Sequence, residues 1–296
     1  RPNGFVAKVI GDTWMSISSF ETLRNDILSG HSFDSFIHLR DVSNHPDIFG
    51  ANAAFVLSMV DAPGRRTPFV RLSSLATEDK RQALLKAIAD PTCGWRFSAS
   101  SADFAKVPSR PIAYWLSDGL RSSFSIGKPL RDIAEPRKGM DTGDNGRFLR
   151  AWWEVPQCAS SLNDFRAGSW VPYNKGGGFR RWYGYREFLV DWRDGGSQMR
   201  TRSGAKYFGR EGWTWGTVTS GGFSIRHTPA GAAFDNGGCT LFSEGDLSAA
   251  ALVLNSTTAD AMLAAISPTL NFQPISIGAV PIVTTVAPAS EAIAVV

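Results

Sequence analysis

The sequence predicts a mixed α+β protein, and three observations lead to this expectation. Of its 296 residues, 43% are hydrophobic and 20% are charged, a balance typical of a folded globular chain and not of a disordered one. Residues 5–60 have the pattern strand, helix, strand, strand. From about Phe124 the chain changes to short β-prone runs separated by glycines.

The N-terminal residues are expected to form one edge of an α/β sheet. Residues 5–10 (FVAKVI) have the composition of a buried strand. Apolar residues at helical spacing then predict a helix over residues 20–28, with Ser18 or Ser19 as its N-cap and Gly30 at its end.

Two further strand-like runs, residues 35–39 and 53–60, are joined by a loop and predict an antiparallel hairpin. A sheet of this kind needs more strands and helices than these residues supply. We therefore expect the chain to be a piece of a longer protein. Its first residue, Arg1, and its apolar C-terminal end also favour this interpretation.

Residues 61–123 are predicted to be a helical linker region. The region begins with the turn-rich DAPGRRTP. An amphipathic helix is expected over residues 77–90, with Thr77 as its cap and Pro91 after its end. Residues 111–120 are also expected to be helical.

Residues 124–296 are predicted to form a second domain, rich in β-structure. Its strand-like runs include FLRAWWEV, REFLVDW, WTWGTVTS and FSIRHT. Residues 246–266 predict two helical pieces that break around residues 255–257, and Pro268 stops the second piece.

The charge of the chain is unevenly distributed. Residues 136–210 contain 14 Lys and Arg but 7 Asp and Glu, a local net charge of +7, so the rest of the chain totals −3. Seven of the ten tryptophans lie between Trp152 and Trp215. This combination indicates a surface for a polyanion, or a Trp-rich core with an Arg rim, and the two interpretations are compatible.

Sequence patterns for metal or nucleotide chemistry are absent from the chain. The three cysteines are far apart and form no CxxC pair, which argues against a zinc or disulfide framework and fits a reducing cytoplasm. The four histidines lack metal-ligand spacing, and there is no GxGxxG loop and no GxSxG elbow. No run of roughly twenty apolar residues predicts a membrane span. We therefore expect no metal, no membrane partner and no catalytic residue in this chain.

Five stretches together resemble one protein family. They are GDTWMSISSFETLR, DIFGANAAFVLSM, IAEPRKGMDTGDNGRFLRAWWEV, WVPYNKGGGFRRWYG and LNSTTADAMLAAISPTLNFQ. They resemble the adenine-specific (N6) DNA methyltransferases of BREX phage-defence systems and related type II restriction–modification enzymes. The resemblance covers nearly the whole chain, and TGDNGRFLRAWWEV and PYNKGGGFRRWYG are its most specific parts.

The resemblance implies a division of the chain. In this family, a Rossmann-like catalytic domain with an Asn-Pro-Pro-Tyr motif binds S-adenosylmethionine, and a target-recognition domain follows it. The cofactor loop and Asn-Pro-Pro-Tyr are both missing here. Residues 1–60 match the end of the catalytic domain, residues 61–123 would be the helical linker, and residues 124–296 would be the α+β target-recognition domain.

The same resemblance implies a function and its partners. The full-length enzyme would methylate adenine in double-stranded DNA, with S-adenosylmethionine as methyl donor, in the cytoplasm. Further restriction or BREX defence subunits would be its other partners. This chain alone is expected to bind no cofactor and to methylate nothing.

One position of the catalytic domain is implied by the resemblance. A loop before the last hairpin strand in these enzymes often places an aromatic ring against the flipped adenine, and Phe49 occupies that position. A flat ring stabilises an extruded base by stacking. The alternative is that Phe49 anchors the loop on its own sheet.

The stretch PYNKGGGFRRWYG is the main candidate for DNA contact, because its cations suit phosphate or base edges and its glycines allow close approach. The candidate residues are Lys175, Gly177, Arg180 and Arg181, with Lys138 and Arg147 beside TGDN as a second set. Trp182 is expected to pack in the core. The alternative is a glycine hairpin whose arginines pair with Glu187 and Asp191.

Two other functions stay open at this point. The first is a stand-alone DNA- or RNA-binding specificity module without catalysis. The second is a carbohydrate-binding β-domain, which the tryptophans suggest. Binding to DNA would depend strongly on salt, whereas carbohydrate binding would not.

Overall fold

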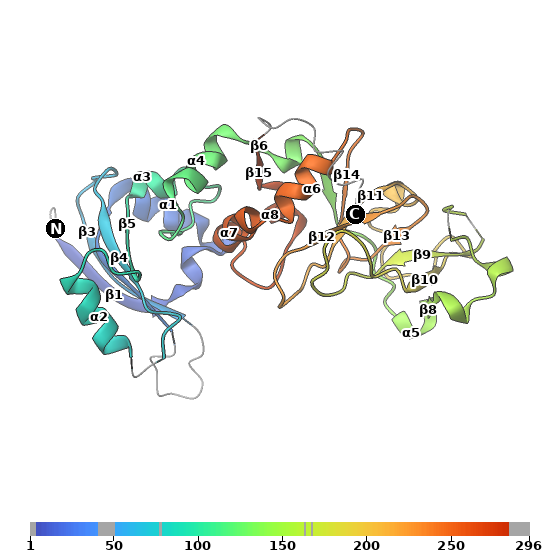
Figure 1. Ribbon diagram of the computed structural model, residues 1–296, viewed down its shortest axis with the longest axis horizontal. Coiled ribbons are helices and arrows are strands. Elements are labelled where there is room, and N and C mark those ends of the chain that lie inside the picture. Colours follow the sequence, from blue (N-terminus) through green and yellow to red (C-terminus); the bar gives the residue numbers. More distant parts are fainter. Residues whose placement is uncertain (1–3, 41–50, 77–78, 163, 167, 284–296) are drawn as a thin grey trace. The chain divides into compact units, whose positions relative to one another are not determined.

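The computed structural model describes residues 4–40, 51–76, 79–162, 164–166 and 168–283. It divides into two compact units, residues 1–125 (unit 1) and residues 126–296 (unit 2). Both units combine helices with strands, which confirms the predicted α+β fold class (Figure 1).

Unit 1 is built on a five-stranded sheet. Its strands are β1 (Phe5–Gly11), β2 (Ser32–Arg40), β3 (Ala51–Ser58), β4 (Thr67–Arg71) and β5 (Arg96–Ala99), in the order β1-β3-β2-β4-β5. β2 and β3 pair antiparallel, as predicted for the hairpin. β3 also pairs antiparallel with β1, so it lies between β1 and β2.

Residues 61–123 contribute strands as well as helices, which the sequence did not predict. β4 pairs parallel with β2, and β5 pairs antiparallel with β4, so both extend the sheet of unit 1. These strands have five and four residues. Runs this short show too little alternation to be distinguished from a linker.

The helical elements of unit 1 are η1 (Asp12–Met15), η2 (Ser18–Phe20), α1 (Glu21–Gly30), α2 (Lys80–Ala89), α3 (Ser101–Phe104) and α4 (Asp118–Ile126). α1 ends at Gly30 as predicted, but its predicted serine cap is wrong. Ser18 and Ser19 form a 3-10 turn, and Phe20 precedes the helix without a side-chain cap.

The other two predicted helices start later than expected. α2 begins at Lys80, and Thr77, its predicted cap, lies outside the described residues. Residues 111–117 are not helical, and α4 begins only at Asp118. Pro111 and the backbone bond from the Ile112 N–H to the Met15 carbonyl (2.8 Å) fit an extended segment that packs on η1.

Helices cover both faces of the sheet in unit 1 (Figure 1). On one face Phe36 and Phe69 pack in a core with Leu28 of α1 and Phe104 of α3. On the other face Val70 packs with residues of α2. Adjacent residues of one strand thus serve two cores, because successive side chains point to opposite faces.

The prediction that β1 is a buried strand is wrong. All seven of its residues are exposed. β1 pairs only with β3 within the described residues, so it is an edge strand, and none of its side chains belongs to the cores described above. The apolar composition of a strand predicts that its side chains are buried. It does not identify the segment that buries them.

Unit 2 contains two four-stranded sheets. One has the order β13 (Ala233–Phe234), β9 (Trp170–Asn174), β10 (Phe188–Asp191), β8 (Leu149–Ala151). The other has the order β12 (Ile225–Thr228), β11 (Gly212–Trp215), β14 (Thr240–Phe242), β7 (Glu135–Arg137). A small pair joins β6 (Lys128–Pro129) and β15 (Pro281–Ile282).

The helices of unit 2 are α5 (Asn145–Phe148), α6 (Ser248–Leu254), α7 (Thr257–Ile266) and α8 (Pro274–Gly278), with short 3-10 turns η3 (Leu130–Asp132), η4 (Trp152–Glu154), η5 (Gln157–Ala159) and η6 (Ala205–Tyr207). The predicted break between two C-terminal helices is confirmed. Ser256 begins the second one, because its hydroxyl accepts a hydrogen bond from the Ala259 N–H.

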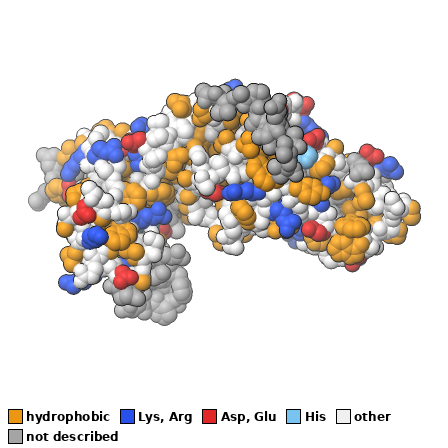
Figure 2. Space-filling model, in the orientation of Figure 1, with side chains coloured by type: hydrophobic (Ala, Val, Ile, Leu, Met, Phe, Trp, Pro, Cys, Tyr) orange, Lys and Arg blue, Asp and Glu red, His pale blue; other side chains and the backbone are white. Residues whose placement is uncertain are grey.

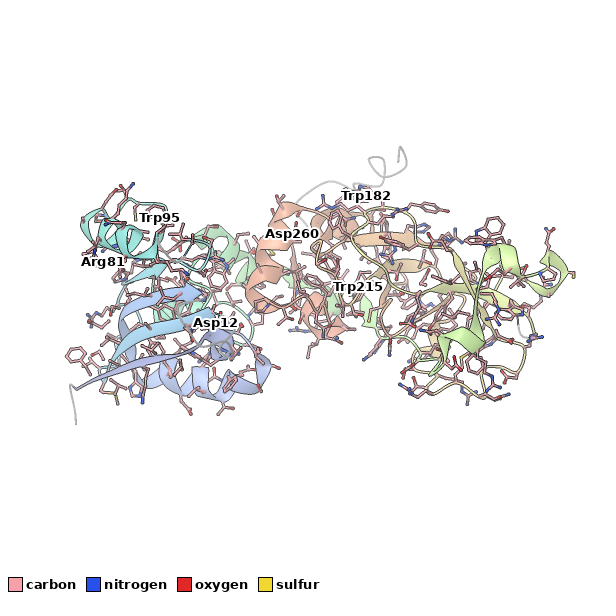
Figure 3. All side chains as sticks on the ribbon, turned by 90° about the horizontal axis from the view of Figure 1, so that it is seen from below. Asp12, Arg81, Trp95, Trp182, Trp215 and Asp260 are labelled. Atoms are coloured by element: carbon pink, nitrogen blue, oxygen red, sulfur yellow. The ribbon has the colours of Figure 1, made fainter. Side chains whose placement is uncertain are left out.

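Tryptophans form part of the interior of unit 2. Trp215 is fully buried, and its indole N–H donates to the Phe272 carbonyl at 2.8 Å (Figure 3). Trp192 and Trp213 are also buried. In contrast, Trp152 and Trp153 are 52% and 64% exposed. Three of the seven tryptophans of unit 2 are therefore buried, two are half-buried and two are exposed, so the Trp-rich core that the sequence suggested is present only in part.

Candidate nucleic-acid interface

Residues 175–187, between β9 and β10, form what we call the glycine-rich loop. Its base is fixed by contact between two backbone segments. Gly176 has φ +98°, and a Cβ atom there would lie 2.4 Å from the Gly237 carbonyl oxygen. The close approach that glycine permits therefore serves packing on the turn of residues 235–238.

A buried carboxylate holds this turn. Asp235 is 3% exposed and accepts hydrogen bonds from the Tyr173 hydroxyl (2.6 Å), the Lys175 Nζ (2.7 Å) and the Gly237 N–H (2.6 Å). Burial, followed by the nearby Asp235 charge, raises the pKa of Tyr173 well above its ordinary value, so its hydroxyl stays a donor. Lys175 is thus ion-paired at the base of the loop.

A stack of three side chains supports the next part of the loop. Gly177 has φ +111°, and a Cβ there would lie 2.9 Å from the Tyr185 ring. The Arg180 guanidinium lies 4.8 Å from the centre of that ring, and the Arg226 guanidinium lies 4.9 Å from it. Cation–π contacts of this kind fix the direction of a guanidinium.

Arg226 is the inner member of the stack, and it is only 1% exposed. One of its Nη atoms donates to the Gly176 carbonyl, while its Nε and other Nη atom have no hydrogen-bond partner among the described residues. Burial lowers the pKa of Arg226 to about 10. Sequence reasoning missed this residue, because a single arginine in the run FSIRHT gives no sign that it is buried.

Replacing Arg226 by methionine is expected to change the free energy of unfolding by less than about 2 kcal/mol, because methionine removes the cost of burying a charge while it loses the bond to Gly176 and the ring contact. The amides of residues 176–185 should exchange faster with deuterium. Arg226→Ala should cost about 3 kcal/mol, since it also leaves a cavity. Equal, severe destabilisation by both variants would contradict this account.

Arg181 pairs with a carboxylate that the sequence did not indicate. Its Nη2 lies 3.7 Å from the Oδ2 of Asp260 on α7 (Figure 3 labels Asp260). Burial raises the pKa of Asp260, and the Arg181 charge opposes that rise. The predicted alternative, in which the loop arginines pair with Glu187 and Asp191, is wrong, since Asp191 is paired with Arg193.

Trp182 is half-buried and has φ +71° (Figure 3). Its backbone N–H donates to the Ile225 carbonyl at 3.2 Å, and its carbonyl accepts from the His227 N–H at 2.9 Å. The loop is therefore held by backbone bonds to β12 at this point. Arg180 precedes this anchor, is exposed and makes no ion pair among the described residues.

The second set of candidates is divided. Lys138 is exposed and stands next to Gly139, where a Cβ would lie 2.1 Å from the Phe234 carbonyl oxygen and 2.6 Å from the Asp235 carbonyl oxygen. Lys138 therefore flanks the same turn as the glycine-rich loop. Arg147 on α5 donates to the Gln198 side chain, and no described contact links it to the loop. Phe49 lies outside the described residues.

The outer part of the loop combines exposed cations and rings. Arg180 and Tyr183 are exposed, and the Arg186 guanidinium lies 5.9 Å from the centre of the Tyr183 ring. On the face that Figure 2 shows, Lys and Arg side chains of unit 2 stand beside exposed hydrophobic ones. Such a surface suits phosphate and flat bases.

The described part of the chain offers neither a metal site nor a single membrane-spanning helix. It contains no group of three or more His, Cys, Asp or Glu side chains placed to hold a metal ion. None of its helices alone has the length and apolar character to cross a membrane, and only α6 and α7 together, bent by 70° at their break, meet that test.

By fold and surface, the chain is an α+β protein with a basic, aromatic loop on its β-rich unit. No family model matches its sequence. Two curated relatives do. The adenine-specific methyltransferase PglX of Lacticaseibacillus casei (strain Zhang) is 31% identical over 297 residues. The adenine-specific methyltransferase BrxX of Escherichia coli O9:H4 (strain HS) is 33% identical over 289 residues.

Each alignment covers 92% of this chain, which spans 24% of PglX and 23% of BrxX. The chain is therefore related by sequence to the adenine-specific methyltransferases, which confirms the family that its motifs resemble. It corresponds to about a quarter of the length of these relatives.

Solved structures give weaker similarity. The type IIG restriction endonuclease BpuSI aligns with 99% of this chain and 42% of its own, at 7% identity and a TM-score of 0.37. A DrdV–DNA complex aligns with 81% of this chain and 30% of its own, at 9% identity and a TM-score of 0.42. Both scores are below the level that establishes a shared fold.

Proposed function

We propose that this chain is the DNA target-recognition part of a site-specific adenine-N6 DNA methyltransferase. The observation that carries the proposal is the glycine-rich loop, in a chain whose relatives are adenine-specific methyltransferases. The loop has a rigid base on residues 235–238 and presents Arg180 and Arg181 next to exposed rings. Direct reading of DNA needs cations that are held in a fixed direction, and this loop supplies them.

We assign residues 1–60 to the end of the catalytic domain and residues 124–296 to the target-recognition domain. Residues 61–123, which the sequence predicted as a linker, extend the sheet of residues 1–60 through β4 and β5. The exposure of β1 supports the first assignment. Phe5 and Val9 are 65% and 70% exposed, although apolar side chains on a strand are normally covered. Further elements of the catalytic domain packed on this face of the sheet would cover them.

The connection from β1 to α1 does not have the character of a cofactor-binding turn. β1 ends at Gly11, the connection itself contains no glycine, and its first carboxylate is already engaged, since Asp12 Oδ2 lies 3.0 Å from His38 Nε2. A phosphate- or cofactor-binding turn needs several glycines and free backbone N–H groups. We therefore assign cofactor binding and methyl transfer to the whole protein, and this chain alone is expected to methylate nothing.

The partners follow from the same proposal. Double-stranded DNA is the primary ligand, and other restriction or BREX defence subunits are further partners in the cytoplasm. Within the whole enzyme, Phe49 would stack on the extruded adenine. Lys175 would act mainly by fixing the loop, because its ammonium is already paired with Asp235.

The test is a salt series of duplex-DNA binding, with the double variant Arg180→Ala plus Arg181→Ala against the unsubstituted chain. The slope of log K against log salt should fall by about one to two, because each phosphate contact adds about 0.9. The control is Arg81→Ala plus Arg166→Ala, which removes the same charge from two exposed arginines elsewhere (Figure 3 labels Arg81).

Equal salt slopes for the two double variants would show that the glycine-rich loop does not contact DNA. Binding of an oligosaccharide with no dependence on salt would favour the carbohydrate-binding alternative, for which the exposed Trp152 and Trp153 would be the contact surface. A stand-alone specificity module would give the same DNA result as our proposal. The two differ in whether the intact protein transfers methyl groups.

A further inference from the structure

A second group of cations lies on unit 2, outside the glycine-rich loop. A surface pocket of about 540 Å³ is lined by Arg137, Lys138, Arg202 and Lys206, around the ring of Tyr207. No carboxylate is among its lining residues. We call it the basic pocket. Of its four cations, the sequence singled out only Lys138.

Two chain segments supply the cations of this pocket, and Pro274 completes its lining. Arg137 ends β7, Lys206 lies in η6, and Arg202 precedes η6. Gly204, with φ +75°, joins the segments, because a Cβ there would lie 2.9 Å from the Lys138 carbonyl oxygen and 2.8 Å from the Phe234 ring. Cations that are far apart in the sequence are thus brought together by backbone packing.

Tyr207 orders two of the cations. Its ring is buried, and the Arg137 guanidinium lies 5.1 Å from its centre and the Lys206 Nζ 4.9 Å from it. The Tyr207 hydroxyl donates to Glu135, which is also the ion-pair partner of Arg137. The hydrogen bond from Arg137 contributes most to lowering the pKa of Glu135 below its ordinary value. The ring and the carboxylate hold Arg137 in place before any ligand arrives.

Only one of the four cations of the pocket, Arg137, has an ion-pair partner within the described residues, and that partner is Glu135. Lys138, Arg202 and Lys206 form no ion pair within the described residues, and all three are exposed. Like charges that converge without partners repel one another, and a bound anion relieves that repulsion. A second pocket of unit 2 has the opposite character, since Glu211, Glu244 and Asp246 line it. The two pockets therefore differ in the sign of the charges that line them.

We propose that the basic pocket binds phosphodiester groups of the DNA backbone, next to the strand portion that the glycine-rich loop reads. The inference rests on the proposed function, since it assumes that DNA is the ligand. Lys138 flanks the turn of residues 235–238 on which the loop is seated, so the pocket and the loop adjoin one structural element. Spread, exposed cations suit a chain of phosphates, because each one contacts a separate group and releases a counterion.

The experiment measures binding of a duplex oligonucleotide to the 296-residue chain across a salt series. The triple variant Lys138→Ala, Arg202→Ala, Lys206→Ala is compared with Arg81→Ala, Lys86→Ala, Arg166→Ala, which removes the same charge outside the pocket. The pocket variant should lower the salt slope by about two to three. Its effect should be uniform across DNA sequences, because phosphate contacts carry no sequence information.

A second readout localises the contact. Acetylation of lysines in the unsubstituted chain is followed by mass spectrometry with and without the duplex. DNA should protect Lys138 and Lys206, and Lys86 serves as an exposed reference. Salt slopes that match those of the control, or equal acetylation of Lys138 and Lys206 with and without DNA, would overturn the pocket proposal alone. Absence of any duplex binding by the unsubstituted chain at low salt would overturn both proposals.

Discussion

Replacing Gly176 by alanine is expected to destabilise unit 2 by about 3 kcal/mol or more. Two costs add at this position. An alanine must adopt φ +98°, which side chains other than glycine rarely do, and its Cβ would lie 2.4 Å from the Gly237 carbonyl oxygen. Because that atom is backbone, it cannot move aside by a change of rotamer, and the turn of residues 235–238 would have to shift.

The measurement is denaturant unfolding followed by tryptophan fluorescence, which reports mainly on unit 2 because seven of the ten tryptophans lie there. Gly222→Ala is the matched control. Gly222 has a similar φ of +90° but no atom within 4 Å of its added Cβ, so only the conformational cost of about 1 kcal/mol should remain. Equal losses for both variants would show that the contact with Gly237 has no influence on stability.

Replacing Asp235 by alanine should cost about 3–5 kcal/mol and should also weaken DNA binding. The substitution leaves the Tyr173 hydroxyl and the Gly237 N–H without an acceptor in a buried site, and removing one partner of a buried ion pair is strongly destabilising. Lys175 would lose the contact that directs it.

Asp194 offers the comparison for this variant. It makes the same local bond, from its carboxylate to the Gly196 N–H at 2.9 Å, but it is exposed. Asp194→Ala should therefore cost much less, because water replaces the lost acceptor. Thermal unfolding of both variants, followed by fluorescence, measures the difference. A loss for Asp235→Ala no larger than that for Asp194→Ala would contradict the buried role of Asp235.

The sequence predicted where helices and strands lie better than it predicted their pairing and burial. Strands with clear apolar runs, such as β2 and β3, and the break between α6 and α7 followed from local patterns. β4 and β5 did not, because they are short and are defined by pairing, of β4 with β2 and of β5 with β4. The exposure of β1 could not be predicted either, since burial depends on which segments lie against a strand.

The candidate site shows the same limit. The pattern of glycine, cation and ring drew attention to residues 172–184, of which residues 175–184 lie in the glycine-rich loop and residues 172–174 end β9. The partners that hold the loop were not visible, because the Lys175–Asp235 pair spans 60 residues and the bond from Arg226 to Gly176 spans 50. Contacts between residues so far apart in the sequence depend on the complete fold, so local residue patterns do not predict them.

The glycine-rich loop separates the residues that hold it from the residues that it presents. Its base is fixed by Gly176, the buried Asp235 and the buried Arg226, and none of these depends on the tip of the Arg180 side chain. Substitutions at the tip can therefore accumulate without a loss of folding. Changes at the outer part of the loop should therefore leave its base in place, whereas a change in the base should displace every side chain that the loop exposes.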